Sequence, residues 1–393
     1  MKKRILAVTL AVASLLITIL TGCGGKDVSD DTITITMVES ITSAERTAIL
    51  REIADKYEAE HENIKIEIVS PPTESADAKI TQMLMDGEKV DIVEVRDFTL
   101  TQFGTNGWLA DIEKYINNWD EKETLTDSAK EVIYYYDDIA YLIPYGFYQR
   151  GIYYRQDWFK DAGLQAPTSW QEIYDAGAKL TNVDNSVYGY SFRGGQNGYI
   201  YADTVMWGYI GADKLDDGRA GYFLKDGNGA TVFTLPETKA ALEFYKKMFK
   251  DICPADAIAW GFSEMVQGFV GGTTAMLIQD PEVIATCSIE MEDDEWALVP
   301  YPVGPSGDAV FPNGFAGWGM TSSCEHPDET ADFLLFLSNE ENNTYFAESY
   351  STIPIHSSAF ENDPFFKEGA YAMYQAMLDD SDTYHQCIRS SDV

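Results

Sequence analysis

The sequence has few of the residues on which metal sites and catalytic thiols depend. Its 393 residues include only four histidines and five cysteines, scattered singly without a C-x-x-C or H-E-x-x-H pattern. Because zinc sites group such residues at short spacings, we expect no metal site, and we expect no cofactor. The pattern leaves open whether the cysteines after residue 23 are free or paired; they are Cys253, Cys287, Cys324 and Cys387.

Nucleotide-binding and nucleophile motifs are missing as well. GFSEM at 261–265 lacks the second glycine of a nucleophile elbow, and GNGATV at 227–232 matches only the first two glycines of a dinucleotide fingerprint. No Walker A sequence occurs. A glycosidase pair of carboxylates must lie about 5–9.5 Å apart in three dimensions, which spacing in sequence does not show. We therefore expect no enzyme, with a surface glycoside hydrolase as the remaining catalytic alternative.

Positive charge is scarce. There are 28 Lys and Arg against 64 Asp and Glu, which gives a formal net charge of -36. Nucleic acid and anionic membrane surfaces would repel such a chain, so neither is an expected partner. With 45% hydrophobic residues the chain is typical of a folded protein, and its length predicts two domains.

The amino-terminal region has a distinct pattern. Positive residues 2–4 precede an apolar run at 5–20, which is shorter than the roughly 20 residues of a membrane-spanning helix. Residues 1–22 therefore read as a signal peptide. LTGC at 20–23 resembles the bacterial lipobox, which implies that Cys23 is acylated as a lipid anchor and that residues 23–31 form a tether. The alternative is an ordinary buried cysteine.

Strand and helix patterns alternate after this region. The apolar periodicity predicts a parallel α/β arrangement in the first half, with right-handed crossovers. Predicted strands and extended segments are 32–38, 64–69, 90–95, 139–143, 151–154, 275–278, 298–302 and 317–321, and predicted helices are 43–60, 76–85, 170–180 and one that begins at 327.

Aromatic residues are unusually frequent in predicted loops and at the ends of elements. Sugars present apolar C–H faces and polar rims, which flat aromatic rings and planar hydrogen-bonding groups hold well. Core packing is the alternative for each ring. The candidate rings are Tyr145, Phe147, Tyr148, Trp207, Trp260, Phe315 and Trp318, and the candidate polar partners are Arg96, Asp97, Arg193, Asp203 and Asn313.

Four stretches in order resemble one family. They are VDIVEVRDFTLTQFGTNGWLADIEKYI (90–116), IPYGFYQRGIYYRQDWFKDAGLQAPTSWQEI (143–173), FVGGTTAMLIQDP (269–281) and NGFAGWGMTSSCEHPDETADFLLFLSNEE (313–341). From residue 32 onward the chain is similar to the extracellular solute-binding proteins of ABC transporters, typified by the maltose-binding protein.

The resemblance implies a two-lobed α/β fold of type II with a ligand cleft between the lobes. It implies a first lobe of 32–148 plus 279–325 and a second lobe of 149–278 plus 326–393. The chain would cross between them near 145–151, 277–280 and 323–330. The protein would be a monomer on the outer face of the membrane that captures a carbohydrate. It would deliver the solute to a permease served by a cytoplasmic ATPase.

The resemblance also implies ligand-contacting residues. Glu39, Ser40, Arg96, Asp97 and the segment 145–148 match positions at which the family contacts its ligand. Where many sugar binders have a stacking tryptophan, this chain has Asp280 and Glu282. An oligosaccharide, an amino sugar or a cationic solute would suit these carboxylates; a polyamine, a polyol phosphate or a peptide is the non-sugar alternative.

Overall fold

The computed structural model describes residues 32–216 and 221–387. The predicted signal peptide, lipid-anchor cysteine and tether at 1–31 lie outside the described residues. Among the described residues, no helix has the length and apolar character needed to span a membrane.

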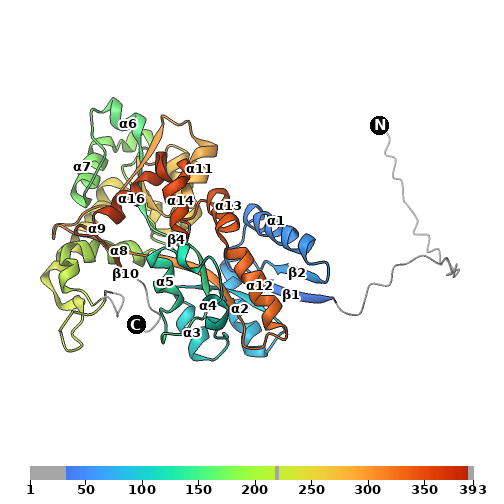
Figure 1. The fold of residues 1–393 in the computed structure, drawn as a ribbon. Coiled ribbons are helices and arrows are strands. Elements are labelled where there is room, and N and C mark those ends of the chain that lie inside the picture. Colours follow the sequence, from blue (N-terminus) through green and yellow to red (C-terminus); the bar gives the residue numbers. More distant parts are fainter. Residues whose placement is uncertain (1–31, 217–220, 388–393) are drawn as a thin grey trace, which may run out of the picture. The chain divides into compact units, whose positions relative to one another are not determined.

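A five-stranded sheet, ordered β2-β1-β3-β9-β4, forms the framework of the first half of the chain (Figure 1). Strand β1 pairs in parallel with β2 and β3, as the predicted α/β pattern requires, whereas β9 is antiparallel to both β3 and β4. The strands are β1 (Ile33–Val38), β2 (Ile64–Val69), β3 (Ile92–Arg96), β4 (Ile143–Tyr148) and β9 (Gly314–Met320).

A three-stranded sheet, ordered β6-β5-β7, belongs to the other part of the fold, and β8 pairs with β10 in a separate ladder. Strand β5 is antiparallel to both of its neighbours. Gly151 opens β5 at a very close approach, because a Cβ there would lie 2.9 Å from the carbonyl oxygen of Val299. The strands are β5 (Gly151–Arg155), β6 (Met276–Gln279), β7 (Trp296–Val299), β8 (Ala309–Pro312) and β10 (Tyr384–Cys387).

The helices begin and end where local side-chain chemistry favours it. The Ser43 hydroxyl accepts from the Arg46 N–H at the start of α1, and α2 ends at Gly87, which has a left-handed φ of 66°. The helices are α1 (Ala44–Glu60), α2 (Thr73–Asp86), α3 (Leu100–Thr105), α4 (Glu113–Asn117), α5 (Asp127–Ile133), α6 (Gln156–Asp161), α7 (Trp170–Leu180), α8 (Tyr199–Ile210), α9 (Pro236–Ile252), α10 (Phe262–Val270), α11 (Val283–Glu290), α12 (Pro327–Ser338), α13 (Glu340–Tyr350), α14 (Ser357–Asn362), α15 (Pro364–Lys367) and α16 (Ala372–Asp379).

We propose that the chain passes between the lobes at the end of β4, because β4 belongs to the five-stranded sheet and β5 to the three-stranded one, and that its later passages lie elsewhere than expected. Strand β7 pairs with β5, so the chain stays with the three-stranded sheet after 279 and returns only between β8 and β9. Helices α12 and α13 pack on α1 and on the five-stranded sheet, so residues after 326 do not leave it at once. We propose a first lobe of 33–148 plus 314–362 and a second of 149–313 plus 363–387.

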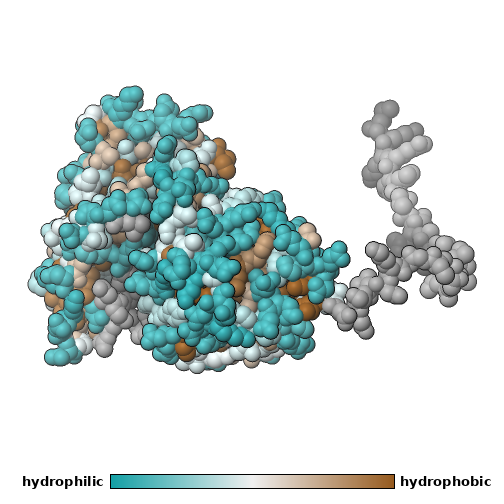
Figure 2. Space-filling model, viewed as in Figure 1, coloured by the Kyte–Doolittle hydropathy of each residue, from teal (hydrophilic) through white to brown (hydrophobic). Residues whose placement is uncertain are grey.

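The interior is apolar and rich in aromatic rings, and hydrophilic residues predominate on the face shown in Figure 2. This surface agrees with the large negative charge. Three of the cysteines are free thiols, with Cys253 and Cys287 buried and Cys324 partly buried.

Candidate ligand-binding site

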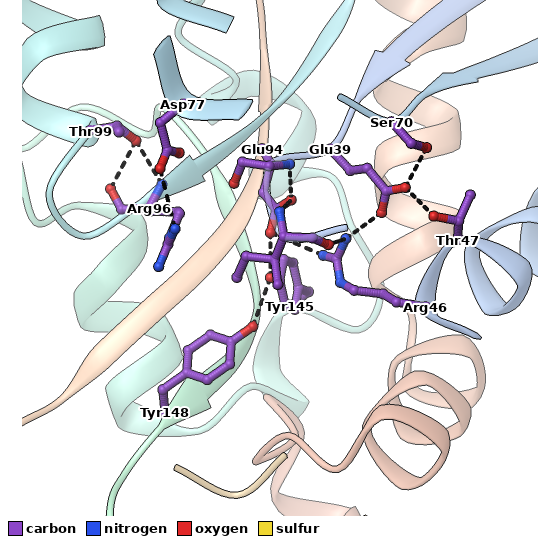
Figure 3. A network of polar contacts seen from close by, with 12 residues as sticks. Glu39, Arg46, Thr47, Ser70, Asp77, Glu94, Arg96, Thr99, Tyr145 and Tyr148 are labelled. Atoms are coloured by element: carbon purple, nitrogen blue, oxygen red, sulfur yellow. Dashed lines mark hydrogen bonds and ion pairs between the residues drawn. The ribbon is translucent and has the colours of Figure 1, made fainter. Parts of the chain in front are cut away.

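A buried arginine organises the polar interior beside the five-stranded sheet. Arg46, in the first turn of α1, donates from Nη1 to Glu39 Oε2 at 2.5 Å and from Nη2 to Glu94 Oε1 at 3.0 Å. All three side chains are inaccessible to solvent (Figure 3). Burial lowers the pKa of Arg46, but the attraction of Glu94 and of nearby tyrosine hydroxyls outweighs this and holds the pKa above its ordinary value. Arg46 is therefore a permanent cation at the centre of the network.

Predicted site residues meet at this arginine, but they bind mainly one another. Glu39 also accepts from Thr47 and Ser70, and Glu94 accepts from the Ser40 backbone N–H at 2.6 Å. The hydrogen-bonding capacity of these carboxylates is thus largely used within the protein. This favours a supporting role for Glu39 and Ser40 over direct contact with a ligand.

Tyr145 links this network to the chain crossover. It is the extra residue at a register shift in the β4–β9 pairing, which turns its side chain inward. Its hydroxyl donates to Glu94 Oε1 at 2.5 Å and lies 2.9 Å from the Tyr148 hydroxyl, and its ring packs 5.2 Å from that of Trp318. Tyr148 is only partly buried, so the network reaches toward solvent at this tyrosine.

Arg96 and Asp97 follow directly at the end of β3. Arg96 Nη1 lies 3.3 Å from Asp77 Oδ2, and its guanidinium lies 4.5 Å from the ring of Phe98. Burial raises the pKa of Asp77, and Arg96 opposes that shift. The arginine side chain remains 28% exposed, so it can contact a solute.

A second polar cluster lies at the start of the three-stranded sheet. Arg150, between β4 and β5, pairs through Nε with Asp280 Oδ1 at 3.1 Å, and its guanidinium lies 5.0 Å from the ring of Tyr201. Tyr153 donates to the Asp280 carbonyl oxygen at 2.8 Å. The crossover and the end of β6 are therefore tied together by a buried ion pair.

Glu282 lies where charges from both sheets meet. Burial and then the repulsion of Asp280 raise its pKa to about 8, against a hydrogen bond from its own backbone N–H and the attraction of Arg150 and Arg96. Its Oε2 atom is buried and has no hydrogen-bond partner among the residues that the structure describes. A buried carboxylate oxygen without a partner is rare in a native protein and calls for an explanation.

Most of the remaining predicted residues make their contacts elsewhere, although Arg193 forms a side-chain hydrogen bond with Tyr201, whose ring lies beside Arg150. Trp207 is 1% exposed and donates to the Gly221 carbonyl oxygen, which favours core packing. Trp260 is partly exposed and donates to Asp256. The other placements are Asp203 accepting from Tyr222, Arg193 5.9 Å from the Phe262 ring, Asn313 donating to Gln386, and Phe147 paired with Phe315 in the core.

The central charged residues of both clusters were missed by sequence reasoning. For Arg46 and Glu94 a signal existed: Arg46 shares the buried face of α1 with Ile49, Leu50 and Ile53, and Glu94 lies inside a strand of apolar residues. Two opposite charges at predicted core positions indicate a buried pair. No comparable signal marked Arg150.

No group of three or more metal-ligating side chains occurs in 32–216 and 221–387. The side chains that make up the two polar clusters are mainly those of arginines, acidic residues and tyrosines. Such a set can bind hydroxyls, amines and apolar ring faces.

Comparisons with known proteins identify related chains. The sequence profile of the family described as bacterial extracellular solute-binding protein matches residues 42–344. An uncharacterized lipoprotein of Streptomyces antibioticus is 20% identical over 376 residues, covering 90% of this chain and 77% of that protein.

Two solved structures share the fold. The ABC substrate-binding protein Lmo0181 of Listeria monocytogenes, in complex with cycloalternan, aligns with a TM-score of 0.75 at 20% identity and covers 91% of this chain and 88% of its own. Maltose-bound MalE3 of T. maritima aligns with a TM-score of 0.77 at 17% identity, covering 90% and 88%. The predicted two-lobed α/β fold is confirmed.

Proposed function

This chain belongs to the bacterial extracellular solute-binding proteins, and from that premise we propose that it captures a carbohydrate outside the cell for an ABC importer. Its family binds solutes without catalysing a reaction. The similar structures contain cycloalternan and maltose, which supports an oligosaccharide as the class of solute.

One observation carries the proposal. Charged and tyrosine side chains from both sheets converge beside the β4–β5 crossover, with Arg96 and Tyr148 on one side and Arg150, Asp280 and Glu282 on the other. A carbohydrate needs such planar polar groups for its hydroxyls and aromatic rings for its C–H faces. A solute between the sheets would contact both groups at once.

The delivery step follows from the arrangement of the chain. We propose that the lobes close about the segments that pass between the sheets, and that a bound solute favours the closed state because it contacts both lobes. The closed form would then dock on permease subunits whose cytoplasmic ATPase drives import. We expect the binding protein to act as a monomer.

Calorimetry with a panel of sugars tests the proposal. A C23S chain, which lacks the proposed lipid-bearing thiol, should release heat with at least one oligosaccharide or amino sugar and return that sugar chemically unchanged after long incubation. Heat only with a peptide or a polyol phosphate would contradict the carbohydrate claim. Hydrolysis products would contradict the assignment as a binding protein.

A separate prediction concerns anchoring. We propose that Cys23 carries the lipid, a position supported by the LTGC sequence and by the related lipoprotein of Streptomyces antibioticus. Replacing Cys23 with alanine should move nearly all of the protein from the membrane fraction to the soluble fraction, and mass spectrometry should find no acylated amino-terminal peptide. The control is Cys324→Ala, which should stay on the membrane. A C23A chain that remains membrane-bound would contradict the proposal.

A further inference from the structure

Glu282 stands apart from the other acidic side chains of the two clusters. Glu39 and Glu94 bind Arg46, Asp77 binds Arg96, and Asp280 binds Arg150, each through an ion pair of 3.3 Å or less. Glu282 has no ion pair in the described part of the chain, although its Oε2 atom is shielded from solvent. Within 32–216 and 221–387, this carboxylate has one oxygen shielded from solvent and forms no ion pair with a basic side chain.

The charge of this carboxylate acts on tyrosines from several elements. Burial raises the pKa of Tyr350, at the end of α13, and the charge of Glu282 is the next largest cause. The same charge acts on four further tyrosines from four other elements, namely Tyr148 of β4, Tyr153 of β5, Tyr371 after α15 and Tyr374 of α16. A carboxylate among aromatic rings is the chemistry that recognises an ammonium group, through charge and through cation–π contact.

We propose that Glu282 selects a solute that carries an ammonium group as well as hydroxyls, and that the ammonium supplies the counter-ion that the protein lacks. This inference rests on the proposed binding function and narrows its class of ligand. Arg150 already forms an ion pair with Asp280, and Arg96 with Asp77, so neither arginine serves as the counter-ion of Glu282.

The titration of Glu282 gives a signature that distinguishes an ammonium from a neutral hydroxyl. Asp280, together with burial, favours the protonated form, whereas the residue's own backbone N–H, Arg150 and Arg96 favour the ionised form. With a pKa of about 8 the empty site is mostly protonated at neutral pH, and a cation must displace that proton to form the ion pair. Affinity for a cation should therefore rise with pH, by about tenfold per unit below 8. A neutral sugar would show no such rise.

Calorimetry on the C23S chain tests this with paired probes: glucosamine against glucose, galactosamine against galactose, the glucosamine dimer against cellobiose, and putrescine alone. We expect an amine to bind more tightly than its neutral counterpart, with affinity rising about thirtyfold from pH 5.5 to 7.0, a range in which the amine stays protonated. Titration in buffers of different ionisation enthalpy should show about one proton released per amine bound.

The variant Glu282→Gln keeps the shape of the side chain and removes its charge. It should weaken amine binding by about ten- to a hundredfold and abolish the pH dependence of that binding. The matched control is Glu290→Gln, the same change at the exposed last residue of α11, the helix for which Glu282 is the N-cap; it should alter neither quantity. Thermal unfolding of both variants checks that they fold.

The outcomes separate this inference from the broader function. Absence of heat with every cationic probe overturns the inference even where a neutral sugar binds, and so does equal binding of both members of each pair. Binding of putrescine with the predicted pH slope, but of no sugar, overturns the carbohydrate claim and supports the role of Glu282. An E282Q chain that folds and keeps the wild-type pH slope overturns the inference as well.

Discussion

Replacing Arg46 with methionine should lower the free energy of unfolding by about 3–5 kcal/mol, because the change leaves Glu39 and Glu94 as buried carboxylates without a counter-ion. Methionine roughly fills the volume of the arginine stem, so the loss measures charge more than cavity. The guanidinium also lies 5.2 Å from the Tyr145 ring and 5.5 Å from the Trp318 ring, contacts that the variant loses as well. Urea unfolding followed by circular dichroism gives the value.

The same helix offers a matched control. Arg51 pairs with Asp55 at 2.7 Å and with Glu58 at 2.6 Å, but its side chain is 32% exposed. Arg51→Met should therefore cost only about 1 kcal/mol. If Arg46→Met and Arg51→Met cost the same, burial of the Arg46 network is not what makes it stabilising.

A double variant isolates the unpaired charge. Adding Glu94→Gln to Arg46→Met removes the charge of one of the two stranded carboxylates. The amide oxygen can still accept from the Ser40 N–H, whereas the amide nitrogen then replaces the oxygen that accepts from the Tyr145 hydroxyl. The double variant should be more stable than Arg46→Met alone. If the double variant is instead less stable than Arg46→Met, Glu94 contributes through its hydrogen bonds more than through its charge.

Local patterns in the sequence predicted the elements well. Helix α7 (170–180) and strand β2 (64–69) occur with the predicted bounds, and α1 differs from the predicted helix only because Ser43 is its cap. In these cases a period of apolar residues is joined to a cap or a turn within a few positions, so the information is local.

The positions at which the chain crosses between the sheets could not be predicted from local patterns in this way. Strand β7 (296–299) is short, and nothing within it tells whether it will pair with β5 or with the first sheet. The choice is made by contacts with residues about 140 positions away in sequence. The resemblance implied passages near 277–280 and 323–330. The pairing of β7 with β5 and the packing of α12 and α13 lead us to propose later ones, after β8 and after α14.

The sequence indicated several residues of the candidate site but not the ion pairs and hydrogen bonds that they form. The resemblance singled out Arg96, Tyr145, Tyr148, Asp280 and Glu282, and the structure brings all five to the polar interior beside the crossover. Their partners were missed, because a buried ion pair requires two positions far apart in sequence. Arg150 pairs with Asp280 across 130 residues, a distance at which no spacing rule operates.

Aromatic residues were the weakest guide, because a tryptophan in a core and one in a binding site look alike in sequence. Trp207 lies on α8, is 1% exposed, and packs against Tyr222 with its indole N–H bonded to a backbone carbonyl. Trp260 lies in a loop and is only partly buried. Burial therefore separates two residues that the sequence treated alike.

Alanine at each position should reveal that difference. Trp207→Ala should lower the free energy of unfolding by about 3–5 kcal/mol, since it leaves a large cavity in the core. Trp260→Ala should cost about 1 kcal/mol, since the side chain is partly exposed and loses one hydrogen bond to Asp256. Urea unfolding monitored by circular dichroism compares the two, because the signal does not depend on the removed indole.

Solute affinity should show the opposite order, with the larger loss in Trp260→Ala. If Trp260 stacks on the solute, Trp260→Ala should weaken the sugar found by calorimetry by about 1–3 kcal/mol, whereas the folded fraction of Trp207→Ala should bind it as the wild type does. A large loss of binding without loss of stability in Trp207→Ala would contradict its place in the core. Unchanged binding in Trp260→Ala would show that this residue does not contact the solute. Trp318 could not replace it, because it packs against Tyr145 and is 1% exposed. The tyrosines near Glu282 would then be the rings available for stacking.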